Sequence, residues 1–142
     1  MLKLKNALNA LSYLQYPLMI AGLVFMYKPL FTDISTIWIG FDKGLILTGV
    51  AVSLSTLQDT KKTQNKLSLK IYQSPRKSRI FLIMIALLVF LFLTLGTAGY
   101  FLTKENVLKE LSTGLIVFGI GILGLLKAAM EMAENHRLPN QK

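Results

Sequence analysis

The sequence predicts an all-α integral membrane protein with four transmembrane helices, arranged as two tandem helical hairpins. Its composition, its four apolar runs and a pair of recurring motifs predict this fold class. Of the 142 residues, 53% are hydrophobic and only 16% are charged, whereas a soluble domain carries about 25% charged residues. A chain of this length has room for one domain, so we expect residues 1–142 to form a single membrane domain.

The clearest apolar run is residues 79–102, which carries no charge after Arg79. It exceeds the roughly 20 residues that a helix needs to cross a hydrocarbon core of about 30 Å. It also lacks the polar stripe that a helix in a water-soluble core would need. Three further runs, at 11–30, 42–58 and 113–132, are predicted to span as well. We therefore divide the chain into a first hairpin (12–58), a basic cytoplasmic loop (59–78), a second hairpin (79–132) and a polar C-terminal tail (133–142).

The positive charge predicts the orientation of these spans. Sixteen Lys and Arg against seven Asp and Glu give a net charge of +9. The excess falls on the N-terminal segment, the loop between spans two and three and the C-terminal end, which are alternate connections. Because positive loops stay cytoplasmic, we predict a multi-pass protein of the bacterial inner membrane with both termini in the cytoplasm.

The basic loop is predicted to contact anionic lipid headgroups, at about 1 kcal/mol per basic side chain. The residues expected to do so are Lys61, Lys62, Lys66, Lys70, Arg76, Lys77 and Arg79. A surface for single-stranded nucleic acid would add aromatic side chains for stacking, and only Tyr72 is near, so we expect no nucleic-acid partner. Within the loop, Ser74-Pro75 has the pattern of a helix start, with serine as the cap.

Two pairs of similar motifs predict an internal repeat. LMIAGLVFMY (18–27) aligns with IMIALLVFLF (83–92), and GLILTGVAV (44–52) aligns with GLIVFGIGI (114–122). Each unit would be a helical hairpin that returns the chain to its starting side. The two units would therefore share one orientation, related by an axis along the membrane normal.

Small residues recur at short spacing in the second and fourth spans, where they allow helix backbones to approach closely in lipid. We predict that they pack the helices together, and a glycine-lined pore or hinge is the alternative interpretation. The predicted packing residues are Gly44, Gly49, Ser53, Gly114, Gly119, Gly121 and Gly124.

The second span opens with FDKGLI (41–46) and is followed by the polar, basic exit LQDTKK (57–62). Together with the tandem hairpins, these motifs resemble the YiaA/YiaB two-helix inner-membrane family over roughly residues 15–132. The resemblance implies the hairpin architecture and no established activity. The second unit departs from the pattern, because STGLI replaces the acidic-Lys-Gly step and GLLKAAMEM replaces the basic exit.

The spans offer no groups for catalysis or for a cofactor. Cysteine is absent, which excludes thiol chemistry and disulfides. The single histidine, His136, lies in the polar tail, so neither haem nor a metal ion is expected. Lys127 is predicted to lie near Glu131 on one helix face and to extend toward the interface. The hydroxyls of Thr48, Ser53, Ser55, Thr56, Thr94 and Thr97 are expected to bond to the backbone of their own helix or to a neighbour.

Asp42 and Lys43 have two interpretations. If the second span begins near residue 42, the pair lies at the interface, and Trp38 would belong to an aromatic belt there. If the helix begins near Ile34, the pair lies about 12 Å into the bilayer, where an ionisable residue is a candidate functional site. We expect the interfacial placement.

The spans carry small residues suited to helix packing and no groups suited to catalysis or to a cofactor. The sequence therefore favours a non-enzymatic scaffold or accessory subunit. Its expected partners are membrane lipids and either another membrane protein or further copies of itself. The alternative is an oligomeric channel, pore or transporter lined by the glycine- and hydroxyl-bearing faces of helices two and four.

Overall fold

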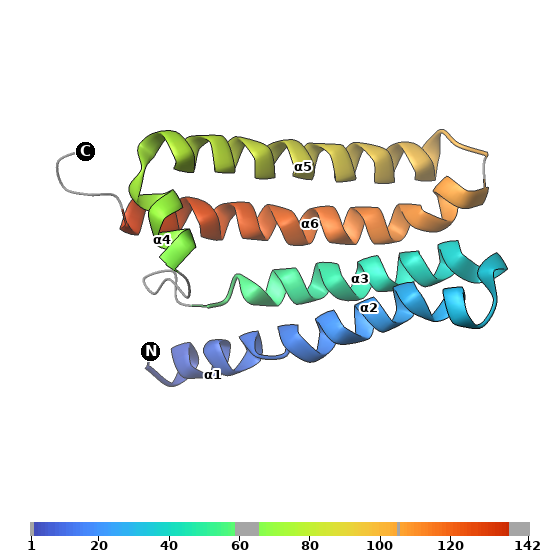
Figure 1. The fold of residues 1–142 in the computed structure, drawn as a ribbon, viewed down its shortest axis with the longest axis horizontal. Coiled ribbons are helices and arrows are strands. Elements are labelled where there is room, and N and C mark those ends of the chain that lie inside the picture. The colour runs from blue at the N-terminus through green and yellow to red at the C-terminus, as the bar shows by residue number, and fades with distance from the viewer. Residues whose placement is uncertain (1, 59–65, 105, 137–142) are drawn as a thin grey trace.

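The computed structural model describes residues 2–58, 66–104 and 106–136, and within them every regular element is a helix. The elements, shown in Figure 1, are α1 (Leu2–Ser12), α2 (Gln15–Phe31), the 3₁₀ helix η1 (Ile34–Thr36), α3 (Ile37–Ser55), α4 (Lys66–Gln73), α5 (Pro75–Phe101) and α6 (Asn106–Asn135). The predicted all-α class is confirmed. Four segments are long and apolar enough to cross a membrane: Asn6–Phe31, Ile34–Ser55, Pro75–Phe101 and Val107–Asn135.

The four long helices lie side by side in the order α2, α3, α6, α5 (Figure 1). Helix α3 packs between α2 and α6, α6 packs between α3 and α5, and α2 and α5 form the edges. The arrangement is thus a row one helix thick. A closed bundle would bring α2 against α5, and these two edges lie on opposite sides of the row.

Alternate connections lie at the same end of the row. The start of α1, helix α4 and the end of α6 share one end, and the turns from α2 to α3 and from α5 to α6 share the other (Figure 1). Helices α3 and α6 consequently run parallel, while each runs antiparallel to its hairpin partner.

Two prolines set local boundaries in the chain. Pro17 lacks the N–H that would bond to the carbonyl of Tyr13 and crowds that carbonyl, and α1 gives way to α2 through a turn at Tyr13 and Leu14. Pro75 is the first residue of α5, as predicted from its fixed φ. Ser74 is extended and precedes the helix, but its backbone carbonyl, rather than its side chain, makes the first bond, accepting from Ser78 N–H.

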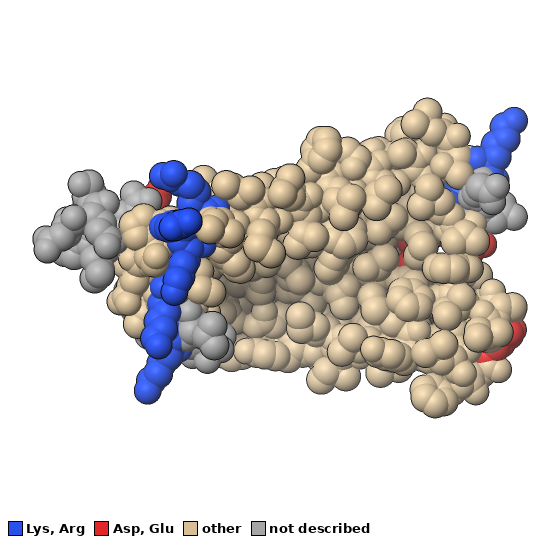
Figure 2. All heavy atoms as spheres, turned by 45° about the horizontal axis from the view of Figure 1, so that its top comes forward, with Lys and Arg blue, Asp and Glu red and all other residues tan. Residues whose placement is uncertain are grey.

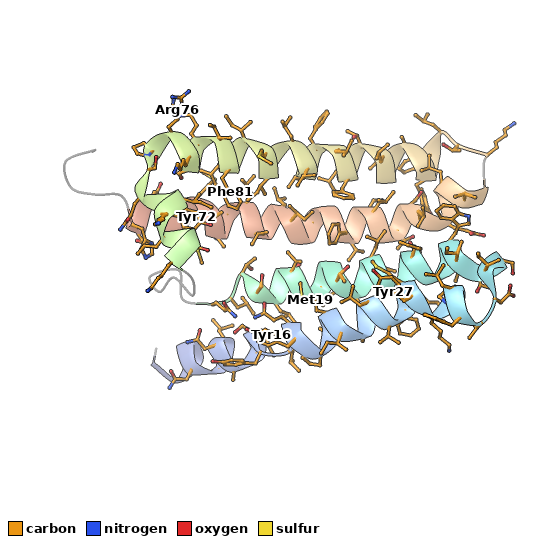
Figure 3. The ribbon with its side chains drawn as sticks, viewed as in Figure 1. Tyr16, Met19, Tyr27, Tyr72, Arg76 and Phe81 are labelled. Carbon is orange, nitrogen blue, oxygen red and sulfur yellow. The ribbon has the colours of Figure 1, made fainter. Side chains whose placement is uncertain are left out.

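Helix α4 lies within the segment predicted as a basic loop, of which residues 59–65 are outside the described residues. Tyr72 anchors it: the side chain is only 8% exposed, and its ring meets Phe81 edge-on at 6.1 Å. Figure 3 shows Tyr72 directed from α4 toward Phe81 on α5. Burial raises the pKa of the Tyr72 phenol. The signal for this helix was the three-residue spacing of Leu69 and Tyr72, with Lys66 and Lys70 on another face.

The contact between α3 and α6 depends on glycine. A Cβ on Gly49 would lie 2.8 Å from the backbone nitrogen and Cα of Phe118, and a Cβ on Gly121 would collide with the Gly49 carbonyl. Real Cβ atoms do not approach backbone this closely, so the two helices meet backbone to backbone.

The predicted packing residues face different neighbours. Gly44 lies against α2, Gly119 lies against Leu93 of α5, and Gly114 lies against Asp42 and Leu45 of α3. Ser53 donates its hydroxyl proton to the Gly49 carbonyl at 3.0 Å. Gly124 is the most open, because a Cβ there would meet only the Thr56 side chain, at 3.3 Å from Cγ2.

Gly49→Ala and Gly124→Ala form a matched pair that tests this contact. We expect Gly49→Ala to lower the free energy of unfolding by about 1–3 kcal/mol, the usual cost of overpacking. Gly124→Ala should be neutral or stabilising, since alanine favours a helix by up to about 1 kcal/mol over glycine. Thermal unfolding in mild detergent, followed by circular dichroism, measures both. Equal effects would contradict a backbone contact at Gly49.

Candidate functional site at the α3–α6 interface

The helical segment that carries Asp42 begins earlier than expected. Asp33 is extended, and its Oδ1 accepts hydrogen bonds from Ser35 N–H (3.0 Å) and Ser35 Oγ–H (2.8 Å). Both bonds lower the pKa of Asp33, and the bond from the Ser35 hydroxyl lowers it more than the bond from the Ser35 backbone. They start η1 at Ile34, and α3 continues from Ile37. The expected start near residue 42 is therefore wrong, and Asp42 lies about 12 Å along the helical segment from Ile34.

The missed signal was the Asp33-Ile34-Ser35 sequence, in which an aspartate two residues before a serine can cap a helical turn. The interfacial interpretation places Trp38 in an aromatic belt, whereas the structure places the residues after Asp33 in η1 and the first turn of α3. Trp38 lies on that first turn, 6.5 Å from the ring of Phe41. Asp42 consequently lies within Ile34–Ser55, a segment that is long and apolar enough to cross a membrane by its length and composition.

Asp42 bridges the two central helices. Its Oδ1 accepts a hydrogen bond of 2.6 Å from the backbone N–H of Gly114 on α6. A Cβ on Gly114 would lie 2.7 Å from the Asp42 carbonyl oxygen and 2.8 Å from Oδ1. Only glycine at residue 114 therefore lets the carboxylate reach the α6 backbone.

The energetics explain why such a bond matters in this position. A charged aspartate at the centre of a membrane helix costs about 2.5–3.5 kcal/mol on insertion scales, and a hydrogen bond to a charged group returns about 1.5–3 kcal/mol. Asp42 is half-buried rather than exposed to lipid. A bond of this kind is therefore large enough to offset much of the cost of an aspartate within a membrane helix.

Lys43 lies on a different side of α3 from Asp42, because successive residues of a helix do not face each other. It is exposed and lines a crevice of about 340 Å³ between α2 and α3, together with Lys28, Pro29 and Gly40. Asp42 therefore faces α6, whereas Lys43 faces the crevice between α2 and α3. Among the described residues, the one ion pair found joins Lys127 and Glu131.

The residue of α6 that the 70-residue offset between the aligned motifs pairs with Asp42 is Ser112, which carries no charge. Ser112 is fully buried and donates its hydroxyl proton to the Leu108 carbonyl of its own helix at 2.7 Å. It also fills the space that a side chain at Gly99 of α5 would occupy. At this level of the row the structure thus places a carboxylate on α3, bonded to the α6 backbone, and a hydroxyl on α6, bonded within its own helix.

The predicted bonding of the hydroxyl residues is confirmed. Each donates to a carbonyl three or four residues earlier in its own helix, at 2.6–3.0 Å for the shortest bond of each residue. The residues are Thr48, Ser53, Ser55, Thr56, Thr94 and Thr97. Their protons are therefore engaged within single helices.

The remaining charged and polar predictions fall near the ends of the row. Lys127 Nζ lies 4.0 Å from Glu131 Oε1, with the lysine side chain 82% exposed. His136 Nδ1 lies 2.9 Å from the Met132 carbonyl. The described residues include no group of three His, Cys, Asp or Glu side chains able to hold a metal ion.

The basic residues form a band at the end of the row that carries α4, and the long middle of the face in Figure 2 has almost no charge. The exposed members of this basic band are Lys66, Lys70, Arg76, Lys77 and Arg79. Lys61 and Lys62 lie outside the described residues.

Four helices long and apolar enough to cross a membrane, with charges gathered at their ends, define a multi-pass membrane protein. No protein-family model, curated protein or solved structure matches the chain. This protein is an open row of helices in which Asp42 of α3 bonds to the backbone of α6 at the central interface.

A double-mutant cycle tests the Asp42–Gly114 bond. Residues that share a contact show interaction energies above about 0.5 kcal/mol, whereas independent sites add within about 0.3–0.5 kcal/mol. We expect Asp42→Ala and Gly114→Ala to be coupled in their free energies of unfolding, and Lys43→Ala and Gly114→Ala to be additive. Thermal unfolding of the single and double variants in detergent provides the energies. Additivity in both cycles would contradict the bond.

Proposed function

We propose that this chain is a non-enzymatic scaffold or accessory subunit of a larger assembly in the bacterial inner membrane. The observation that carries the proposal is the open row of helices. A row one helix thick encloses no lumen and presents more lateral surface than a closed bundle of the same length. Large apolar side chains cover that surface, among them Ile20 and Leu87, each 63% exposed, and Phe90 at 68%.

The chemistry of the spans supports the same proposal. The hydroxyl protons bond within their own helices, and the single carboxylate in the central interface bonds to a backbone amide. A membrane enzyme needs a nucleophile, an acid–base pair or a bound cofactor, and the described residues bring no such set together. A structural role in an assembly requires none of these groups.

We also propose that the two hairpins are an internal repeat of the kind that the resemblance to the YiaA/YiaB family implies. In support, α3 and α6 run parallel, and the Asp42–Gly114 bond joins residues 72 positions apart, close to the 70 between the aligned motifs. The aligned glycines nevertheless face different partners, since Gly44 contacts α2 and Gly114 contacts α3. The proposal therefore includes divergence of the two units at the central interface.

The charge pattern supports a cytoplasmic location for the basic end, because positively charged segments stay on the cytoplasmic side. Reporter fusions test this orientation. We expect alkaline phosphatase fused after residue 68 to be inactive and a fluorescent protein fused there to fold, with the reverse result after residue 104. Active phosphatase after residue 68 would overturn the topology.

Photo-crosslinking tests the scaffold proposal in cells. We expect p-benzoylphenylalanine in place of the exposed Leu87 or Ile20 to give a discrete adduct with another membrane protein. The matched control is Val89 on α5, which is 7% exposed and contacts α6 within the same chain, so that no intermolecular adduct should form. The absence of a protein adduct from both exposed positions would contradict the proposal.

An oligomeric channel is the second candidate, and Asp42 is the observation that favours it, because an intramembrane carboxylate commonly marks an ion pathway. Ion flux into liposomes that contain only this protein separates the candidates. The scaffold proposal expects no flux. Flux that Asp42→Asn abolishes and Lys43→Gln retains would establish the channel and refute the scaffold.

A further inference from the structure

We propose that the groove between α5 and α6 at the basic end binds one anionic phospholipid. The groove has a volume of about 400 Å³ and lies between the start of α5 and the end of α6. The proposal goes beyond the scaffold role, because it concerns a site for a small ligand and holds whether or not another protein binds the row.

The walls of the groove are suited to an acyl chain. Leu82, Ile83 and Ala86 line it from α5, and Leu126 and Met130 line it from α6. From Pro75 at its mouth to Ala86, the groove follows α5 for about 16 Å. It therefore runs from the level of the headgroups into the hydrocarbon core, as an acyl chain does.

The polar rim of the groove is suited to a phosphate. Arg79 lies there, exposed, and an arginine fork binds phosphate oxygens through two parallel hydrogen bonds. Glu134 lines the opposite side of the rim and is exposed. Glu134 would repel a second negative charge on the headgroup, which disfavours lipids with more than one phosphate charge. The preference for a net anionic headgroup such as phosphatidylglycerol comes from the basic band.

The surroundings favour a lipid of the membrane over a soluble phosphate. The basic band raises the local concentration of anionic headgroups, and the groove opens on the apolar surface that lies in the bilayer. Arg76 belongs to the same band but points away from α6 (Figure 3). Arg76 and Arg79 thus differ in access to the groove while sharing residue type, helix and exposure.

Native mass spectrometry from detergent tests the site, with dioleoylphosphatidylglycerol and dioleoylphosphatidylcholine as chain-matched probes. We expect the protein to retain one phosphatidylglycerol in preference to phosphatidylcholine. Arg79→Gln should weaken phosphatidylglycerol binding about tenfold, the factor for the roughly 1.5 kcal/mol at the lower end of a hydrogen bond to a charged group. Arg76→Gln, the matched control, should leave binding within twofold.

A second pair of variants tests the acyl-chain wall. Ala86 is exposed and lines the groove, whereas Ala10 is exposed on α1, far from it. Ala86→Leu should fill the groove and reduce retention of phosphatidylglycerol, and Ala10→Leu should not. Equal losses from Arg76→Gln and Arg79→Gln, equal retention of both lipids, or displacement by millimolar glycerol 3-phosphate would each overturn the proposal.

Discussion

The backbones of α3 and α6 meet at Gly49 and Gly121, where neither helix carries a side chain. In lipid, burying an apolar surface gives no hydrophobic free energy, because the lipid tails are as apolar as the side chains. Helices therefore associate through close packing and hydrogen bonds. A side chain at either glycine would collide with the backbone of the facing helix. This contact joins the two hairpins, and α2 and α5 pack on the outer sides of α3 and α6.

The Asp42 carboxylate depends on the same contact. It reaches the Gly114 amide only because α3 and α6 approach closely and because residue 114 has no side chain. On the other side of α3, Lys28 and Lys43 line the crevice against α2. The central interface instead gives the Asp42 carboxylate a backbone donor, and this bond adds a directional contact to an interface built of apolar contacts.

The open row also determines which side chains form the outer surface of the protein. The glycines with close contacts face inward to neighbouring helices, so large apolar side chains dominate the exposed surface. Near the basic end this surface is interrupted by the groove between α5 and α6, with Arg79 and Glu134 on its rim. Helix α4 packs close by through Tyr72 and positions part of the basic band at this end of the row.

Much of this fold could be predicted from the sequence, since a chain crossing lipid must satisfy its backbone hydrogen bonds internally and long apolar runs therefore form helices. Pro75 marked the start of α5, and the alternation of charge correctly placed alternate connections at one end. The start of α3 was missed because its first turns are aromatic and resemble an interface belt, although Asp33 and Ser35 carried the capping signal.

The sequence by itself determined the class of protein, the number of spans and the hydroxyl bonding within single helices. Only the tertiary structure decided the order of the helices, the partner of each glycine and the bond between Asp42 and Gly114. The physical reason is that these helices are apolar on all sides. Their periodicity does not indicate which face meets which neighbour, and that choice is made by backbone contacts between residues about 70 positions apart.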